Sequence, residues 1–236
     1  GHVLVTPDGR EYCYGYNAAT AEVAGSLYQA ALPIANHANQ SVDTVRAGAL
    51  GHMAGGAQVV SATVGASTAA IDLYMEGSAH INAGASAGLG FLYRIARAHA
   101  AAGAHAAMAG SDAIAVNLAD GESVQVALVV TTSKLTYAHH RFRNTLIHDS
   151  PPTANLAGVA AVAAAASRWL WYQVNGLAAV LTSGTLIIDD VCVPSATVDG
   201  AVMPSVAIET DGPVVGRVAT VNATGEISLI DLALGR

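Results

Sequence analysis

The sequence predicts an all-β protein with little helix. Short β-favouring runs recur along the chain and are separated by turn-forming Gly, Pro, Asn and Asp residues. Residues 168–236 show the pattern best, because aromatic and β-branched runs there alternate with glycine turns. Strands this short, with turns this regular, favour a small barrel-like or sandwich domain at the C-terminal end.

Residues 1–35 are expected to form an N-terminal arm and a β-hairpin. Pro7–Arg10 contains a residue of fixed φ, a side-chain cap and a glycine, so it predicts the hairpin turn. In the strand that follows, Tyr12, Tyr14 and Tyr16 recur with period two and therefore line one face. A half-buried sheet face explains this pattern. The alternative is a contact face for another protein, since tyrosine is enriched at interfaces.

Residues 36–150 are expected to form a β-rich middle domain. Strands are predicted at Ala57–Val64, Phe91–Ile95, Ile114–Leu118 and Ser123–Thr132, and alternating apolar residues make the last of these the clearest central strand. The alanine-rich segment Ala98–Ala109 is compatible with helix, strand or loop. A loop is preferred there, because its neighbours are strands.

Residues 151–167 are expected to be a linker or a strand that leads into the C-terminal domain. Consecutive prolines in Asp149–Pro152 exclude both helix and sheet ladder. Leu156–Ser167 is ambiguous, because its alanines favour helix and its setting favours an extended strand; we expect the strand. Within residues 168–236, Asn175–Gly176 predicts a hairpin turn, because both residue types tolerate positive φ.

Composition excludes several classes of function. Charged residues make up 11% of the chain and hydrophobic residues 53%, whereas about 25% charge is typical of soluble domains. Such a surface suits either a protein that buries area in assemblies or a compact alanine-rich monomer. The net charge of −7, with Lys134 as the single lysine, opposes binding to nucleic acids or anionic membranes. No apolar run is long enough to span a membrane, and the N-terminus shows no secretory signal pattern.

No residue pattern predicts catalysis, a metal site, a cofactor or a small-molecule substrate. His139 and His140 are adjacent, but no nearby ligand completes a metal set. His148–Asp149 could act as an acid–base pair only beside a nucleophile. Asp189–Asp190 favours a turn over a cation site, and Cys13 and Cys192 suit buried free thiols better than a disulfide.

Several blocks of sequence follow one another in an order that is similar to that of a known protein family: Gly9–Tyr12, Tyr93–Ile95, Ser133–Lys134, Trp171–Gly176 and Leu229–Leu232. Together they resemble virion structural proteins of tailed bacteriophages, of the head decoration (cement) type. The resemblance implies a non-enzymatic homotrimer that is made in the host cytoplasm and binds the major capsid protein outside an icosahedral head. There it would stabilise contacts between capsomers.

This resemblance directs attention to candidate interface residues. Val3, Leu4 and Val5 lie in a segment that could pair with a neighbour's sheet edge. Tyr12, Tyr14 and Tyr16 could form a contact face. Arg141 and Arg143 belong to a positive cluster, with His139, His140 and nearby Lys134, that is either a solvated loop or a contact for a negative surface.

A different class of function remains open for the aromatic residues. Trp169, Trp171 and Tyr172 could stack on sugars in a carbohydrate-binding or adhesion module on a virion or cell surface. Trp171 and Tyr172 are adjacent and would face opposite sides of a strand, so at least one is expected in the core. A metal-dependent hydrolase that uses His139, His140 or His148 is the third and least favoured class.

Overall fold

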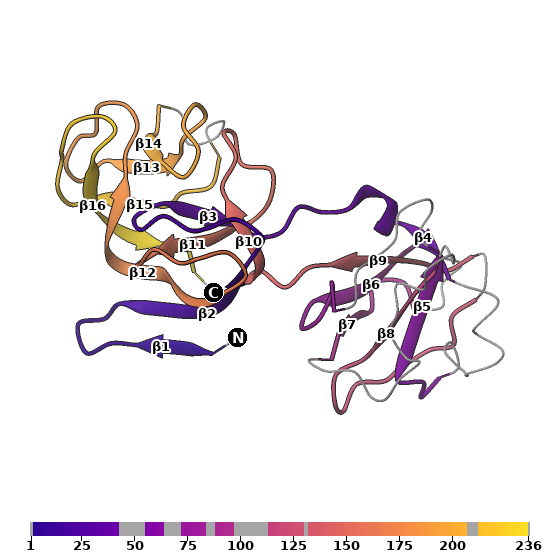
Figure 1. Cartoon of the computed structure of the whole chain (residues 1–236). Helices are drawn as coiled ribbons and strands as arrows, with labels where there is room; N and C mark the ends of the chain where they lie inside the picture. The colour runs from indigo at the N-terminus through magenta and orange to yellow at the C-terminus, as the bar shows by residue number, and fades with distance from the viewer. Residues whose placement is uncertain are drawn as a thin grey trace. The chain divides into compact units, whose positions relative to one another are not determined.

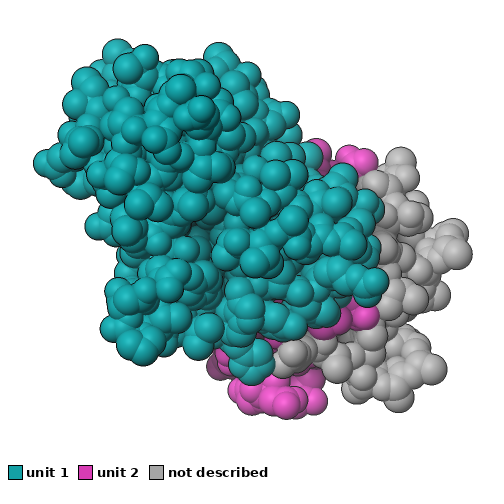
Figure 2. Space-filling model, turned by 60° about the vertical axis from the view of Figure 1, so that its left-hand side comes forward, with its two compact units in different colours: residues 1–32, 141–236 teal, residues 33–140 magenta. Residues whose placement is uncertain are grey.

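The computed structural model describes residues 2–42, 55–63, 72–83, 88–96, 113–129, 132–206 and 212–235. These residues are nearly all β, which confirms the predicted fold class. The helical content of the described part is one short 3-10 turn, η1 (Ala35–His37). The chain divides into two compact units, residues 1–32 with 141–236 and residues 33–140, coloured separately in Figure 2.

The first unit is built on a single ten-stranded sheet. Its longest strand, β12, has 13 residues and is shared by two groups of strands. Figure 1 labels the ten strands: β1 (Val3–Val5), β2 (Glu11–Asn17), β3 (Leu27–Gln29), β10 (Arg143–Ile147), β11 (Leu156–Ala160), β12 (Trp169–Leu181), β13 (Val191–Pro194), β14 (Val202–Pro204), β15 (Gly216–Val218) and β16 (Ile227–Ala233).

Five of these strands close into a ring, called here the first barrel. β2 pairs with β10 in parallel, and β10 with β3, β3 with β11, β11 with β12, and β12 with β2 are all antiparallel pairs. Because the ring closes, each of the five strands has a partner on both sides for at least part of its length. A buried cluster that includes Cys13, Tyr28, Leu170, Tyr172 and Val174 belongs to this ring.

The C-terminal half of β12 begins the second group of strands. The order continues β12–β16–β15–β13–β14, and a parallel bridge between Thr182 and Val202 brings β14 back beside the end of β12. Cys192, Ile230 and Leu232 lie in the buried cluster of this group. The sequence alternation along β12 therefore contributes to two cores in succession.

The second unit is a separate set of six strands. β4 (Gln40–Ser41), β9 (Lys134–Ala138), β6 (Ser78–Ala83) and β7 (Leu92–Arg94) form one sheet, and β5 (Val59–Thr63) pairs with β8 (Ala113–Asn117). Bridges from Val42 to Ala62 and from Ile95 to Leu118 join the two sheets into a ring. The strands β5, β7 and β8 confirm three of the predicted strands.

The prediction of a central strand at Ser123–Thr132 is wrong in its described part. No ladder forms between residues 123 and 129, and the chain bends near Gln125. Val124 and Leu128 are buried, whereas Val126 between them is exposed, so the burial does not follow the apolar alternation. The Val124 N–H instead donates to the Ala57 carbonyl at 2.8 Å, and this segment packs as a loop.

The predicted hairpin at Asn175–Gly176 is also wrong. Gly176 has the expected positive φ of 76°, but β12 runs straight through it. The register shifts between Gln173 and Asn175, which is the irregularity that the glycine accommodates. Asn175 pairs with Glu11 on one side and Ala233 on the other, so ladders hold the chain extended.

The unit boundaries also differ from the four segments expected from the sequence. β12 pairs with β2 along six residue pairs, so residues 1–35 and 168–236 do not form separate parts. Within residues 151–167, Leu156–Ala160 is a fully buried strand of the first barrel rather than a linker. The extended strand expected over Leu156–Ser167 is confirmed for Leu156–Ala160, whereas residues 161–167 contain bends and a single bridge at Ala164. Residues 98–109 lie outside the described residues.

Candidate interaction surface

A row of four aromatic side chains lies on the face of β2 and β12 that points away from the core of the first barrel. This aromatic row consists of Tyr14, Tyr16, Trp169 and Trp171. The register places Tyr14 opposite Trp171 and Tyr16 opposite Trp169. Tyr14 stacks on Trp169, with ring centroids 5.3 Å apart and planes 13° apart, and lies 4.9 Å from Trp171. Cross-strand pairs of this kind stabilise the sheet.

The alternation along β2 produces this row. Cys13, Gly15 and Asn17 point into the barrel and are buried. Gly15 is required there, because a Cβ would lie 2.7 Å from the Phe142 carbonyl oxygen. The prediction that Tyr12, Tyr14 and Tyr16 share one face is therefore confirmed.

The row is partly open to solvent. Trp169 is 45% exposed, and Tyr14, Tyr16 and Trp171 are half-buried. Tyr172 is fully buried on the opposite face of β12. The adjacent Trp171 and Tyr172 thus face opposite sides, as expected, and Tyr172 cannot reach an external ligand.

The two arginines proposed for the interface have different surroundings. The Arg143 guanidinium carbon lies 5.8 Å from the Tyr16 ring centroid, and the Arg143 Nε is buried without a hydrogen-bond partner among the described residues. Arg141 instead donates hydrogen bonds to the carbonyl oxygens of Leu156, Leu234 and Gly235. Burial lowers its pKa. Arg143 extends the aromatic row with a cation, whereas Arg141 holds the C-terminal backbone.

β1 forms an edge strand with an open side. Its only strand partner in the described chain is β2, and Figure 1 shows the two as neighbouring arrows. Val3, Leu4 and Val5 are 44%, 44% and 55% exposed. The segment expected to be an arm is thus one strand of a hairpin, with apolar side chains and an unpaired edge.

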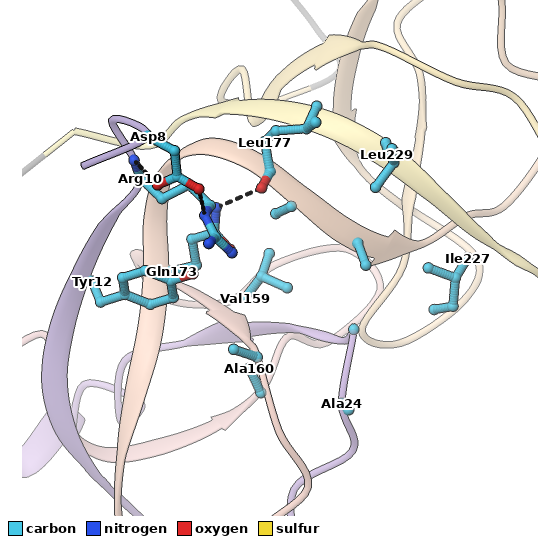
Figure 3. A pocket seen from close by; sticks show the side chains of 14 residues that line it. Asp8, Arg10, Tyr12, Ala24, Val159, Ala160, Gln173, Leu177, Ile227 and Leu229 are labelled. Atoms are coloured by element: carbon cyan, nitrogen blue, oxygen red, sulfur yellow. Dashed lines mark hydrogen bonds and ion pairs between the residues drawn. The ribbon is translucent and has the colours of Figure 1, made fainter. Parts of the chain in front are cut away.

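A groove lies beside the C-terminal half of β12 (Figure 3). Its volume is about 620 Å³, and its lining is mostly apolar, including Val159 of β11, Leu177 of β12 and Ile227 of β16. Arg10 and Gln173 lie at its polar end, where Arg10 forms an ion pair with Asp8. Sequence reasoning missed this groove, because its walls come from segments far apart in the chain.

A buried polar cluster lies inside the first barrel. The Tyr172 hydroxyl donates to Glu22 Oε1, and the Thr145 hydroxyl lies 3.3 Å from the same oxygen. Burial raises the pKa of Glu22 to about 7, although both hydrogen bonds lower it in part. Glu22 follows β2 in a connecting loop, and no local pattern marks it as buried.

The histidines and acids considered for catalysis have structural contacts. His148 places Nδ1 and Nε2 each 2.7 Å from a backbone carbonyl oxygen. The Asp149 carboxylate accepts hydrogen bonds from Gln29 and Thr153 instead of facing His148. His139 stacks on Tyr74 at 4.7 Å, and burial lowers its pKa. Asp189 lies in a turn, as expected.

The described residues contain no group of three or more His, Cys, Asp or Glu side chains that could hold a metal ion. Among them, no helix is long and apolar enough to cross a membrane. Cys13 and Cys192 are both buried, and they are not joined in a disulfide, as expected.

Comparison with known proteins yields no relative: no family model, curated protein or solved structure matches this chain. The fold therefore defines the class directly, as an all-β protein. Its distinguishing surface features are the edge strand β1, the aromatic row and the groove beside β12.

Proposed function

We propose that this chain is a head decoration (cement) protein of a tailed bacteriophage, which binds the major capsid protein as a homotrimer on the outside of the head. The ordered sequence blocks that resemble such proteins motivate the proposal. The structural observation that carries it is the open edge of β1, with three exposed apolar side chains, on an all-β scaffold.

The physical basis is attachment through main-chain groups. An unpaired strand edge offers regularly spaced N–H and C=O groups to an extended segment of another protein. Val3–Val5 carries no charged side chain, so such pairing does not require an ion to be desolvated. Three copies that bind together convert moderate contacts into tight attachment. In this role the protein acts mechanically and turns over no substrate.

Co-sedimentation with expanded phage heads tests the proposal. The protein should pellet with heads that lack decoration and should behave as a trimer in light scattering. A variant without residues 1–6 should lose most head binding while its melting temperature changes little, because β2 keeps its pairs with β10 and β12.

A matched control removes apolar surface elsewhere. Ile187→Ser with Ile188→Ser replaces two exposed apolar side chains outside the strands and should leave head binding unchanged. Failure of the full chain to pellet with heads would contradict the proposal, and so would equal loss of binding and of fold on truncation.

A carbohydrate-binding or adhesion module is the second candidate, and the aromatic row favours it. A half-exposed row of Trp and Tyr rings offers apolar faces to sugar rings, and the Arg143 guanidinium lies beside it. Binding to a glycan array that Trp169→Ala abolishes and Ile187→Ala preserves would support this function. If the protein bound no glycan on the array, carbohydrate binding would be excluded for the glycans that the array carries.

A further inference from the structure

We propose that the groove beside β12 takes the β1 edge of a second copy of this chain, so that copies join head to tail by strand addition. This inference deepens the homotrimer of the proposed function and relies on it for the number of copies. The β1 edges then build the trimer, so residues 1–6 act on head binding through the valency of the trimer and not through a direct contact with the capsid. The contact depends on an open edge of β12, an open edge of β1 and the match between the two edges.

β12 pairs with β16 on one side, and on its other side, which faces the groove, Leu177 and Ala179 have no strand partner in the described chain. Ala179 lies opposite Leu229 of β16. The Leu229 carbonyl is bonded on the far side, where it accepts from the Ala219 N–H at 2.8 Å. Because bonding directions alternate along an antiparallel ladder, the Ala179 main chain points away from β16. The same holds for Leu177, two residues earlier.

Neighbouring contacts support this direction. The Leu181 N–H donates to the Gly25 carbonyl at 2.8 Å on the side away from β16. The Gln173 side-chain amide donates to the Leu177 carbonyl at 2.9 Å. No hydrogen bond within the described residues reaches the Leu177 N–H or the main chain of Ala179. Among the described residues, the N–H groups of Leu177 and Ala179 and the Ala179 carbonyl therefore have no hydrogen-bond partner on the groove side of β12. Gly25 borders this opening, since a Cβ there would lie 3.4 Å from the Ala179 carbonyl oxygen.

β1 offers a matching open edge. The Tyr14 N–H donates to the His2 carbonyl at 2.8 Å, and the Thr6 N–H donates to the Arg10 carbonyl at 2.9 Å. The even-numbered residues of this segment thus face β2, and the main-chain groups of Val3 and Val5 point to the open side. These groups recur every two residues, or about 7 Å, which is the repeat of Leu177 and Ala179.

The chemistry of the groove selects an extended peptide. Only a polypeptide strand supplies N–H and C=O groups at this repeat. The groove walls are mostly small and apolar, and Val3–Val5 is apolar and uncharged. Two chains that each carry a net charge of −7 can therefore meet there without like charges facing each other across the contact. The same chain carries both edges, which points to a second copy as the occupant.

The symmetry of this contact favours a ring. β1 and the groove are different patches on the surface, so each copy uses one patch for each neighbour. Such a heterologous contact generates a closed ring when the rotation between copies closes. A trimer is the ring expected from the proposed function.

Cysteine cross-linking of the purified protein tests the contact. Each variant would carry Ala179→Cys together with Val3→Cys, Leu4→Cys or Val5→Cys, so that three registers of the contact are sampled. The native thiols are buried, and burial raises the pKa of Cys192 to about 12, so they contribute little background. Mild oxidation should link a large share of at least one variant into dimers and trimers that reductant dissolves.

The control pair places Val221→Cys, at another exposed position, with the same β1 cysteine. It should link at least ten-fold less. Equal linkage in both pairs, or no linkage in any β1 and Ala179 combination, would overturn the inference.

A proline variant tests the strand addition itself. Ala179→Pro removes an N–H that the chain's own ladder does not use, which an edge position tolerates. It should weaken self-association at least ten-fold with the melting temperature nearly unchanged, whereas Ala179→Ser, which keeps the N–H, should associate normally. Normal association of a folded Ala179→Pro protein would overturn the inference.

These assays contain no phage heads, so their outcome is separate from that of the proposed function. A protein that binds heads but remains monomeric would refute the second-copy contact and the homotrimer, and would leave head decoration itself standing. Should that monomer lose head binding through Ala179→Pro, the occupant of the groove would be a capsid-protein segment instead. A cross-linked trimer that ignores heads would refute decoration alone.

Discussion

The Tyr172 hydroxyl donates a hydrogen bond to Glu22 inside the first barrel, while the second Glu22 oxygen, Oε2, is buried without a partner in the described chain. Glu22 is only 3% exposed. A carboxylate in such a place loses hydration that one satisfied oxygen does not replace, so the neutral acid is favoured. The first barrel therefore contains a group whose ionisation opposes its own fold.

This arrangement predicts that stability falls as pH rises. The pKa of Glu22 is about 7 in the folded protein and 4.5 ordinarily. The stabilisation from the protonated acid is fully present below pH 4.5 and is lost as pH rises through 7. Glu22→Gln should remove about 1–3 kcal/mol of this pH dependence. Urea unfolding between pH 4 and 8 measures it, with Asp120→Asn, at an exposed carboxylate, as the control.

Gly216 should not tolerate a side chain. A Cβ there would lie 2.1 Å from the Asp231 carbonyl oxygen, and β15 cannot shift away because it pairs with both β13 and β16. We expect Gly216→Ala to lower the free energy of unfolding by about 2–4 kcal/mol. Gly55→Ala is the matched control, since its nearest atom would be 3.8 Å away. A Gly216→Ala protein with unchanged thermal unfolding would contradict the close packing of this ladder.

Arg141 should contribute to stability more than an exposed arginine does. Arg141→Met keeps much of the aliphatic stem but leaves three carbonyl groups without their donor, at a cost of about 2–4 kcal/mol. Amide exchange should accelerate first at Leu234 and Gly235. The exposed Arg168 provides the comparison, because Arg168→Met should change stability by less than about 0.5 kcal/mol. Similar losses in both variants would contradict an anchoring role.

Three neighbouring residues of β12 should respond to truncation in order of burial. Leu170→Ala creates a cavity in the first barrel and should cost about 2–5 kcal/mol. Trp171→Ala, at a half-buried position, should cost about 1–3 kcal/mol, and Trp169→Ala, on the exposed end of the aromatic row, about 1 kcal/mol or less. Chemical denaturation gives the ranking. If Trp169→Ala lowered the free energy of unfolding more than Leu170→Ala does, the assignment of Trp169 to the outer face of β12 and of Leu170 to the core face would be wrong.

Local patterns predicted much of the fold. Period two along Tyr12–Tyr16 gave the correct face of β2, and glycine-bounded apolar runs gave the all-β class. These features depend on residues that are close in sequence, where alternation and turn chemistry act directly.

Features that depend on distant partners could not be predicted in this way. Asn175–Gly176 has the chemistry of a hairpin turn, but ladders to Glu11 and Ala233 keep it within β12. The pairing of Tyr14 with Trp171 joins the two ends of the chain, and nothing near either residue specifies the other. The candidate site shares this origin, because the groove and the burial of Glu22 arise only once the barrel has closed.

The placement of residues 33–140 between β3 and β10 has a consequence for biosynthesis. The strands β1 to β3 leave the ribosome long before β10, β11 and β12 exist to pair with them. At about 5–20 residues per second, the early strands wait for several seconds with unmatched edges while the inserted segment is completed. Because the first barrel closes slowly through pairs that are distant in sequence, its early strands can aggregate with other nascent chains. The need for chaperones should therefore be highest while residues 33–140 are translated.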